Sequence, residues 1–175
     1  MPVLYAIKVP NSQSNMNTLS KIITWKRNIL ASAAVLLTLI VLSFYGVYTN
    51  QFYFLKADNY IFPILTSVHF LYLYVVWFKI TEDELPDPKM RNIEYVLYAI
   101  MIVYAFKIYD SIAVLNSINL YGQHVIPATF KPVATLSVVL YSILPILTLY
   151  TFWLRKRYVG VYNFENYNDN LNIWQ

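Results

Sequence analysis

Four long apolar blocks dominate this 175-residue chain. Each block approaches the ~20 residues that an α-helix needs to cross the hydrocarbon core of a bilayer. Hydrophobic residues make up 58% of the chain and charged residues 13%, and a core of this size cannot hide that excess from water. Because the blocks are too long for strands and show no polar–apolar alternation, we expect an all-α integral membrane protein. The four predicted transmembrane spans are residues 29–48, 60–78, 93–115 and 133–154.

The connections between these blocks are short, which favours antiparallel neighbours in an up-down four-helix bundle. We therefore expect a polar N-terminal segment at 1–28, a transmembrane domain at 29–154 and a C-terminal tail at 155–175. The first 28 residues lack the apolar core and cleavage site of a signal peptide, so the first span is predicted to be an uncleaved anchor. The tail is rich in asparagine yet carries several aromatic rings. We expect it to dock on the bundle or on a partner.

The basic residues orient the predicted bundle. Cytoplasmic loops of membrane proteins carry an excess of Lys and Arg. With the N-terminus inside, ten basic residues fall on the inner side and two on the outer side. The inner ten are Lys8, Lys21, Lys26, Arg27, Lys79, Lys89, Arg91, Arg155, Lys156 and Arg157, and the outer two are Lys56 and Lys131. We expect both termini to be cytoplasmic, in a bacterial inner membrane or the inner membrane of an organelle.

Two opposite charges, Lys107 and Asp110, interrupt the third block. A lone lysine at that depth costs about 3 kcal/mol on insertion scales, and positions i and i+3 are neighbours on a helix. One interpretation is a self-neutralising ion pair whose lysine reaches outward. The other is a functional site, either an ion or proton relay or an anchor for a charged group on another subunit. Intramembrane charges are functional candidates by default.

His69 falls near the centre of the second span, with Thr66 and Tyr72 one turn away on either side. It could titrate, or it could hydrogen-bond a neighbouring helix. The other histidine, His124, lies in the predicted outer loop, which excludes a haem held by two histidines at membrane depth. His69 also has no partner at i+4 for a catalytic metal. We therefore predict no metal and no cofactor.

Polar groups recur in two further places. The fourth span carries Ser137, Tyr141, Thr148 and Thr151 on one side by helical spacing, where hydroxyls usually bond across helix interfaces or to their own carbonyls. The loop between the second and third spans holds four acids, Glu82, Asp83, Glu84 and Asp87. Thr81 and Glu84 match a capping box, and we expect the acids to be solvated rather than catalytic.

The chain contains no cysteine and three glycines, which excludes thiol chemistry and a glycine-rich nucleotide loop. Serine-hydrolase and zinc-protease motifs are also missing, so no catalytic residue is assigned. No basic stripe is left over for nucleic acid. The leading hypothesis is a non-enzymatic membrane protein that serves as an accessory or structural subunit, alongside other membrane subunits or copies of itself. The alternatives are a small oligomeric transporter or channel lined by His69, Tyr104, Lys107 and Asp110, and a membrane enzyme acting on a lipid or quinone.

Overall fold

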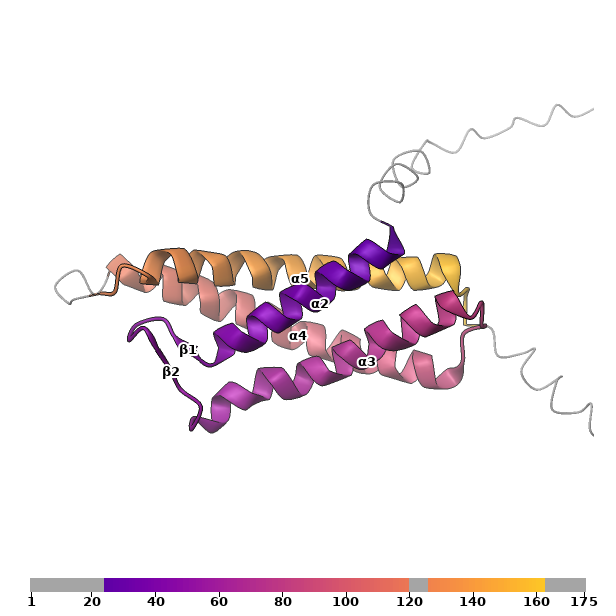
Figure 1. Cartoon of the computed structure of the whole chain (residues 1–175), viewed down its shortest axis with the longest axis horizontal. Helices are drawn as coiled ribbons and strands as arrows, with labels where there is room; N and C mark the ends of the chain where they lie inside the picture. The colour runs from indigo at the N-terminus through magenta and orange to yellow at the C-terminus, as the bar shows by residue number, and fades with distance from the viewer. Residues whose placement is uncertain (1–23, 120–125, 163–175) are drawn as a thin grey trace, which may run out of the picture.

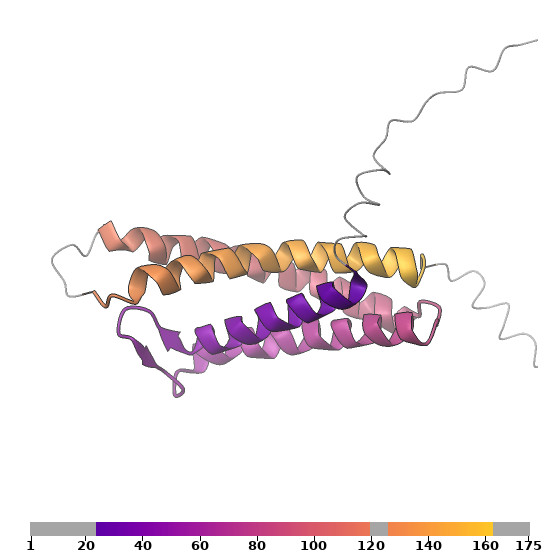
Figure 2. The ribbon, with the colours of Figure 1, turned by 45° about the horizontal axis from the view of Figure 1, so that its top comes forward.

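The computed structural model describes residues 24–119 and 126–162, and within these ranges it is built of helices and one short hairpin (Figures 1 and 2). Four helices in this part of the chain are long and apolar enough to cross a membrane. In chain order, the elements are α2 (Trp25–Ser43), β1 (Tyr45–Gly46), β2 (Gln51–Phe52), η1 (Ala57–Tyr60), α3 (Ile61–Thr81), α4 (Pro88–Asn116), η2 (Ser117–Asn119) and α5 (Phe130–Tyr158).

The β1–β2 hairpin and the start of α5 lie at one end of the bundle, here called the hairpin end (Figure 1). The loop 82–87 lies at the opposite end, here called the 82–87 end. At about 1.5 Å per residue, the 29 residues of α4 and of α5 each span about 43 Å. This length exceeds the roughly 30 Å of a hydrocarbon core, so both helices reach into the headgroup layers.

Helix α2 ends at Ser43, whereas the sequence predicted a first span that continues to Tyr48. The Ser43 hydroxyl donates to the Ile40 carbonyl at 2.7 Å and also contacts the Asn59 carbonyl at 3.2 Å. The chain then enters the antiparallel hairpin, in which Gly46 pairs with Gln51. A side chain at Gly46 would collide with the Tyr53 ring. Hydropathy did not separate residues 44–48 from the helix, because most of them are aromatic or aliphatic.

The predicted capping box at Thr81 and Glu84 is wrong. Thr81 is the last residue of α3, and its hydroxyl donates back to the Trp77 carbonyl at 2.8 Å. The residue that caps a helix is Asp87, whose carboxylate accepts the Met90 backbone N–H at 2.7 Å. Pro88 occupies the first turn of α4, where its missing N–H costs nothing. Helix α4 therefore begins at Pro88, five residues before Ile93, where the sequence predicted the third span to start.

The buried core runs along the whole bundle. Its larger apolar members are Leu36, Leu39, Phe62, Tyr72, Met90, Leu97, Tyr104, Tyr141 and Leu144. Helix α5 packs mainly against α4 and α2, and α3 packs against α2 and α4. Many large apolar side chains of the four helices are exposed, and most of the exposed charged residues lie near the helix ends. Such a surface suits a helix bundle whose solvent is lipid, and the four candidate spans are consistent with a multi-pass membrane protein.

Candidate functional site

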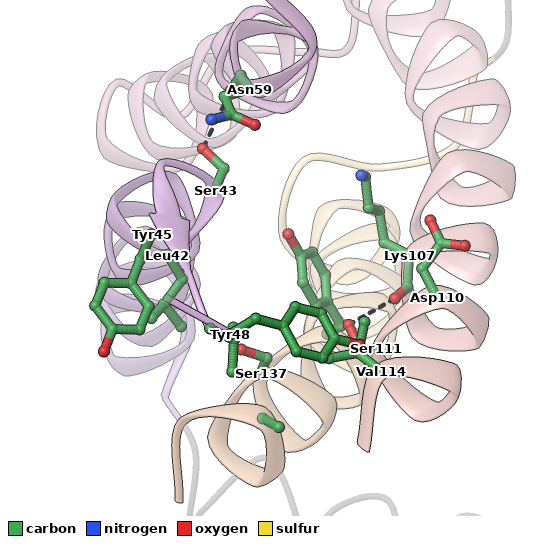
Figure 3. A pocket seen from close by; sticks show the side chains of 13 residues that line it. Leu42, Ser43, Tyr45, Tyr48, Asn59, Lys107, Asp110, Ser111, Val114 and Ser137 are labelled. Carbon is green, nitrogen blue, oxygen red and sulfur yellow. Dashed lines mark hydrogen bonds between the residues drawn. The ribbon is translucent and has the colours of Figure 1, made fainter. Parts of the chain in front are cut away.

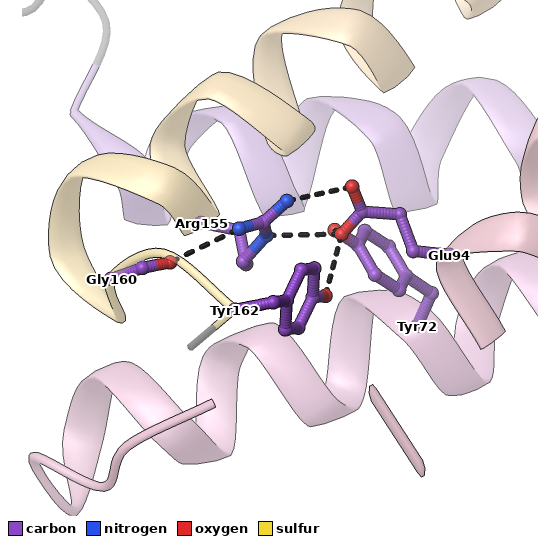
Figure 4. A network of polar contacts seen from close by, with 5 residues as sticks. All are labelled: Tyr72, Glu94, Arg155, Gly160 and Tyr162. Carbon is purple, nitrogen blue, oxygen red and sulfur yellow. Dashed lines mark hydrogen bonds and ion pairs between the residues drawn. The ribbon is translucent and has the colours of Figure 1, made fainter. Parts of the chain in front are cut away.

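A buried ion pair joins α4 to α5 near the 82–87 end (Figure 4). Arg155 donates from Nη2 to Glu94 Oε1 at 2.7 Å and from Nε to Oε2 at 3.0 Å. Both residues are nearly inaccessible, at 7% and 4% exposure. A bidentate arginine–carboxylate pair of this kind is among the stronger hydrogen-bonded contacts in proteins. It fixes the register of the two helices.

Two tyrosines complete the arrangement around Glu94. The Tyr72 hydroxyl from α3 donates to Oε2 at 2.9 Å, and the Tyr162 hydroxyl donates to the same oxygen at 2.8 Å. The Tyr162 ring also lies 4.2 Å from the Arg155 guanidinium. Burial, followed by the hydrogen bond to Glu94, raises the pKa of Tyr162 above its ordinary value. We call these four residues the Glu94 cluster.

The chain reaches Tyr162 through a turn that only glycine adopts easily. Gly160 has a φ of +113°, a conformation that side chains disfavour. Its carbonyl accepts a hydrogen bond from Arg155 Nη1 at 3.0 Å. The residues after α5 therefore fold back onto the bundle and add Tyr162 to the cluster. This is the described beginning of the tail that was expected to dock; residues 163–175 lie outside the described ranges.

The Glu94 cluster was not found by sequence reasoning. Arg155 was counted among the residues that orient the bundle, and Glu94 stood beside the predicted start of its span. One signal was available: Glu94 is followed by a long apolar run, and an acid inside a membrane helix needs a partner. With α4 beginning at Pro88, Glu94 lies about 9 Å inside the helix.

Three of the four acids of the loop 82–87 are exposed, as expected, and Asp87 is half-buried. The Lys79 ammonium contacts the Glu84 carboxylate at 2.7 Å and the Asp87 carboxylate at 3.1 Å. Partial burial opposes ionisation of Asp87, but the Met90 N–H and the Lys79 ammonium outweigh it and lower the pKa of Asp87 below its ordinary value. These contacts hold the end of α3 against the start of α4. Their role is structural.

His69 lies fully buried in the middle of α3, and its Nδ1 is 3.0 Å from the Tyr104 hydroxyl of α4. The structure thus brings together two of the predicted site residues across a helix interface. His69 Nε2 has no hydrogen-bond partner among the described residues, and neither do Asn28 Oδ1 and Ser32 Oγ on α2. Asn28 Nδ2 does donate to Thr151 of α5, at 2.7 Å.

The hydroxyls of α5 mostly bond to their own helix. Ser137, Thr148 and Thr151 each donate to the carbonyl four residues earlier, at 2.8–2.9 Å. This is one of the two arrangements expected from the sequence. Few of these hydroxyls therefore remain free to line a water-filled path between the helices.

Lys107 and Asp110 do not form the self-neutralising pair that their spacing suggested. No ion pair joins them within residues 24–119 and 126–162. Spacing on a helix places two side chains on neighbouring positions, but it does not determine where their ends point. Both instead line a cavity of about 320 Å³ at the hairpin end, together with residues from α2, the hairpin and α5 (Figure 3).

This cavity collects polar groups from several elements. Besides the two charges, it is lined by hydroxyls and an amide from Ser43, Tyr45, Tyr48, Asn59, Ser111, Ser137 and Tyr141. Asp58 is not part of this lining, and its carboxylate lies 3.9 Å from the Lys56 ammonium in an exposed pair. His124 falls outside the described residues. Within the described ranges, no three His, Asp or Glu side chains come close enough to hold a metal ion.

No protein-family model, no curated protein and no solved structure matches this chain. Its function must therefore be argued from its own residues.

Proposed function

We propose that this chain is a non-enzymatic accessory or structural subunit of a larger membrane assembly. In this proposal its helices form an antiparallel up-down bundle with both termini in the cytoplasm, or in the equivalent compartment of an organelle. The ten-to-two distribution of basic residues supports that orientation. The chain contributes a rigid bundle, and one of its outer helical faces packs against a transmembrane helix of another subunit.

The observation that carries this proposal is the filled core between the cavity at the hairpin end and the Glu94 cluster. From the cavity inward, the Tyr141 ring packs against Phe62 at 5.4 Å, and Phe62 packs against Tyr104 at 6.0 Å. All three side chains are buried. Beyond them, Leu36, Leu97 and Leu144 are fully buried as well. A bundle closed in this way offers ions no continuous wet path.

The polar groups within that core also argue against a relay. No hydrogen bond connects the Tyr104 and Tyr141 hydroxyls within the described part of the chain, and His69 Nε2 has no partner there. The His69–Tyr104 contact and the Glu94 cluster are therefore separate links between helices. Interhelical hydrogen bonds of this kind hold membrane bundles together.

The outer face of α2 supports a role in assembly. Ala31, Ala34 and Thr38 are exposed there, and Leu30, Leu37 and Val41 flank them. Small residues on a membrane helix let another helix backbone approach closely. Thr38 already donates to the Ala34 carbonyl at 2.9 Å, so its hydroxyl adds little polarity to this surface. We call these six residues the α2 face and propose that it binds a transmembrane helix of another subunit.

Site-specific photocrosslinking tests this proposal in native membranes. A photoreactive side chain at Leu37, which is 58% exposed on the α2 face, should yield one discrete crosslinked protein species. The matched control is Leu136 on α5, which is 45% exposed and lies outside the α2 face. Adducts only with lipid at both positions, or equal protein adducts from both, would contradict the proposal.

A further inference from the structure

The cavity at the hairpin end holds two opposite charges that the protein itself leaves unpaired. Within the described ranges, neither the Lys107 ammonium nor the Asp110 carboxylate makes an ion pair or a side-chain hydrogen bond. Figure 3 shows the Lys107 amine directed toward the space between the helices and the Asp110 carboxylate pointing away from it. Charges at membrane depth normally pair with each other or with backbone carbonyls. A ligand that carries both charges would pair with Lys107 inside the cavity and with the exposed Asp110 at its edge.

The depth of these residues fits the boundary between headgroups and acyl chains. Asp110 lies six residues from the end of α4 at Asn116, or about 9 Å, and Lys107 lies about 13 Å from that end. Helix α4 exceeds the hydrocarbon thickness by about 13 Å, shared between its two ends. Asp110 therefore sits near the hydrocarbon boundary, and Lys107 lies a few ångströms deeper.

The rest of the lining is polar and aromatic. Tyr45, Tyr48 and Tyr141 line the cavity together with Lys107. Ser137 and Asn59 also belong to the lining. The volume of about 320 Å³ is at the lower end of the range for small-molecule pockets, which suits a headgroup rather than a whole lipid.

An apolar groove adjoins the cavity at Asp110. This second hollow, of about 530 Å³, runs along the outer face of α4 and is lined by Ile102, Ala105, Phe106, Tyr109 and Asp110. Asp110 is the residue common to both hollows. A polar cavity that shares a lining residue with an apolar groove suits an amphiphile, with its headgroup at the cavity and its chain against the helix.

We propose that this composite site binds a zwitterionic phospholipid. Lys107 binds the phosphate, Asp110 binds the ammonium, and an acyl chain lies in the groove over Ala105. The site is separate from the α2 face, so it can exist whether or not the chain is a subunit of a larger assembly.

Native mass spectrometry of the whole chain in detergent tests this proposal. The probes are dioleoyl phosphatidylethanolamine, dioleoyl phosphatidylglycerol and dioleoylglycerol, which share acyl chains and differ in headgroup. We expect phosphatidylethanolamine to be retained at least about tenfold better than the other two. Equal retention of all three would show nonselective annular lipid and overturn the proposal.

Variants separate a binding role from a structural one. Lys107→Gln and Asp110→Asn should each reduce retention of phosphatidylethanolamine about tenfold, and Asp110→Asn should also erase the preference over phosphatidylglycerol. Lys131→Gln, which changes an exposed lysine outside the cavity, should leave retention unchanged. The ratio of the two lipids is the decisive readout, because a folding defect would lower both together.

Two further arms test the acyl-chain part of the site. Ala105→Trp fills the groove and should lower retention, whereas Val139→Trp at an exposed position of α5 should not. Soluble phosphoethanolamine, which lacks acyl chains, should bind far more weakly than the lipid. If it binds as well as the lipid, or if Ala105→Trp has no effect, the site does not recognise a phospholipid.

Discussion

Arg155 binds Glu94 through two hydrogen bonds, of 2.7 and 3.0 Å, although the two residues lie 61 positions apart in the chain. This contact and the two tyrosine hydroxyls on Glu94 tie α3, α4 and the end of α5 into one unit. In low dielectric, the loss of one member leaves the other charged and unpaired, which costs more than the pair contributes.

The first prediction concerns this pair. Glu94→Ala and Arg155→Ala should each destabilise the bundle by about 3–5 kcal/mol, because each leaves a buried charge uncompensated. The double variant should be less destabilised than either single variant. Reversible denaturation in mixed micelles measures all three. If the destabilisation of the double variant equals the sum of the destabilisations of the two single variants, the two residues do not act as a pair.

The second prediction is a dependence on pH at the loop 82–87. The pKa of Asp87 is lower in the folded chain than in the unfolded chain. Its contribution to stability is therefore fully present above the ordinary value of 3.8 and is lost as pH falls through the lower, folded value. Thermal denaturation between pH 7 and pH 3 should show this loss. The Asp87→Asn variant keeps a side chain that can cap α4. It should be less stable than the unmodified chain at pH 7, and its stability should fall less on acidification.

The third prediction is topological. Because the chain has no native cysteine, single cysteines can report which end of the bundle faces outward. Leu55 at the hairpin end is fully exposed and Leu85 at the 82–87 end is 80% exposed. In intact cells or sealed organelles, an impermeant thiol reagent should label Leu55→Cys and not Leu85→Cys. The reverse pattern would invert the proposed orientation.

The sequence was sufficient to predict the helical class and four candidate spans, because long apolar runs leave a chain few alternatives. It did not locate the ends of the first and third spans, and it did not predict that His69 would contact Tyr104. It could not reveal the Glu94 cluster, because pairing between residues on different helices depends on helix rotation and register. Of the two interpretations of Lys107 and Asp110, the self-neutralising pair does not form for a related reason: neighbouring positions on a helix do not fix the direction of two flexible side chains.

The fourth prediction follows from the filled core. Liposomes that contain only this chain should show no ion or proton flux above that of empty liposomes. His69→Ala should alter stability without altering flux, since it removes the hydrogen bond to Tyr104. Robust flux that disappears in His69→Ala and Asp110→Asn would favour the transporter hypothesis instead.

The most direct test of the proposed role is the size of the native assembly after a change on the α2 face. Ala34→Phe places a bulky ring among the small residues of that face, and Ala99→Phe makes the same substitution at an exposed position of α4. Membranes solubilised in mild detergent are compared by native electrophoresis and by the proteins that co-purify with the chain. We predict that the unmodified chain and Ala99→Phe migrate in one large complex of constant composition, and that Ala34→Phe migrates as the free chain. Migration of the unmodified chain by itself, or a complex that survives Ala34→Phe unchanged, would contradict the proposal that the α2 face joins this protein to a membrane assembly.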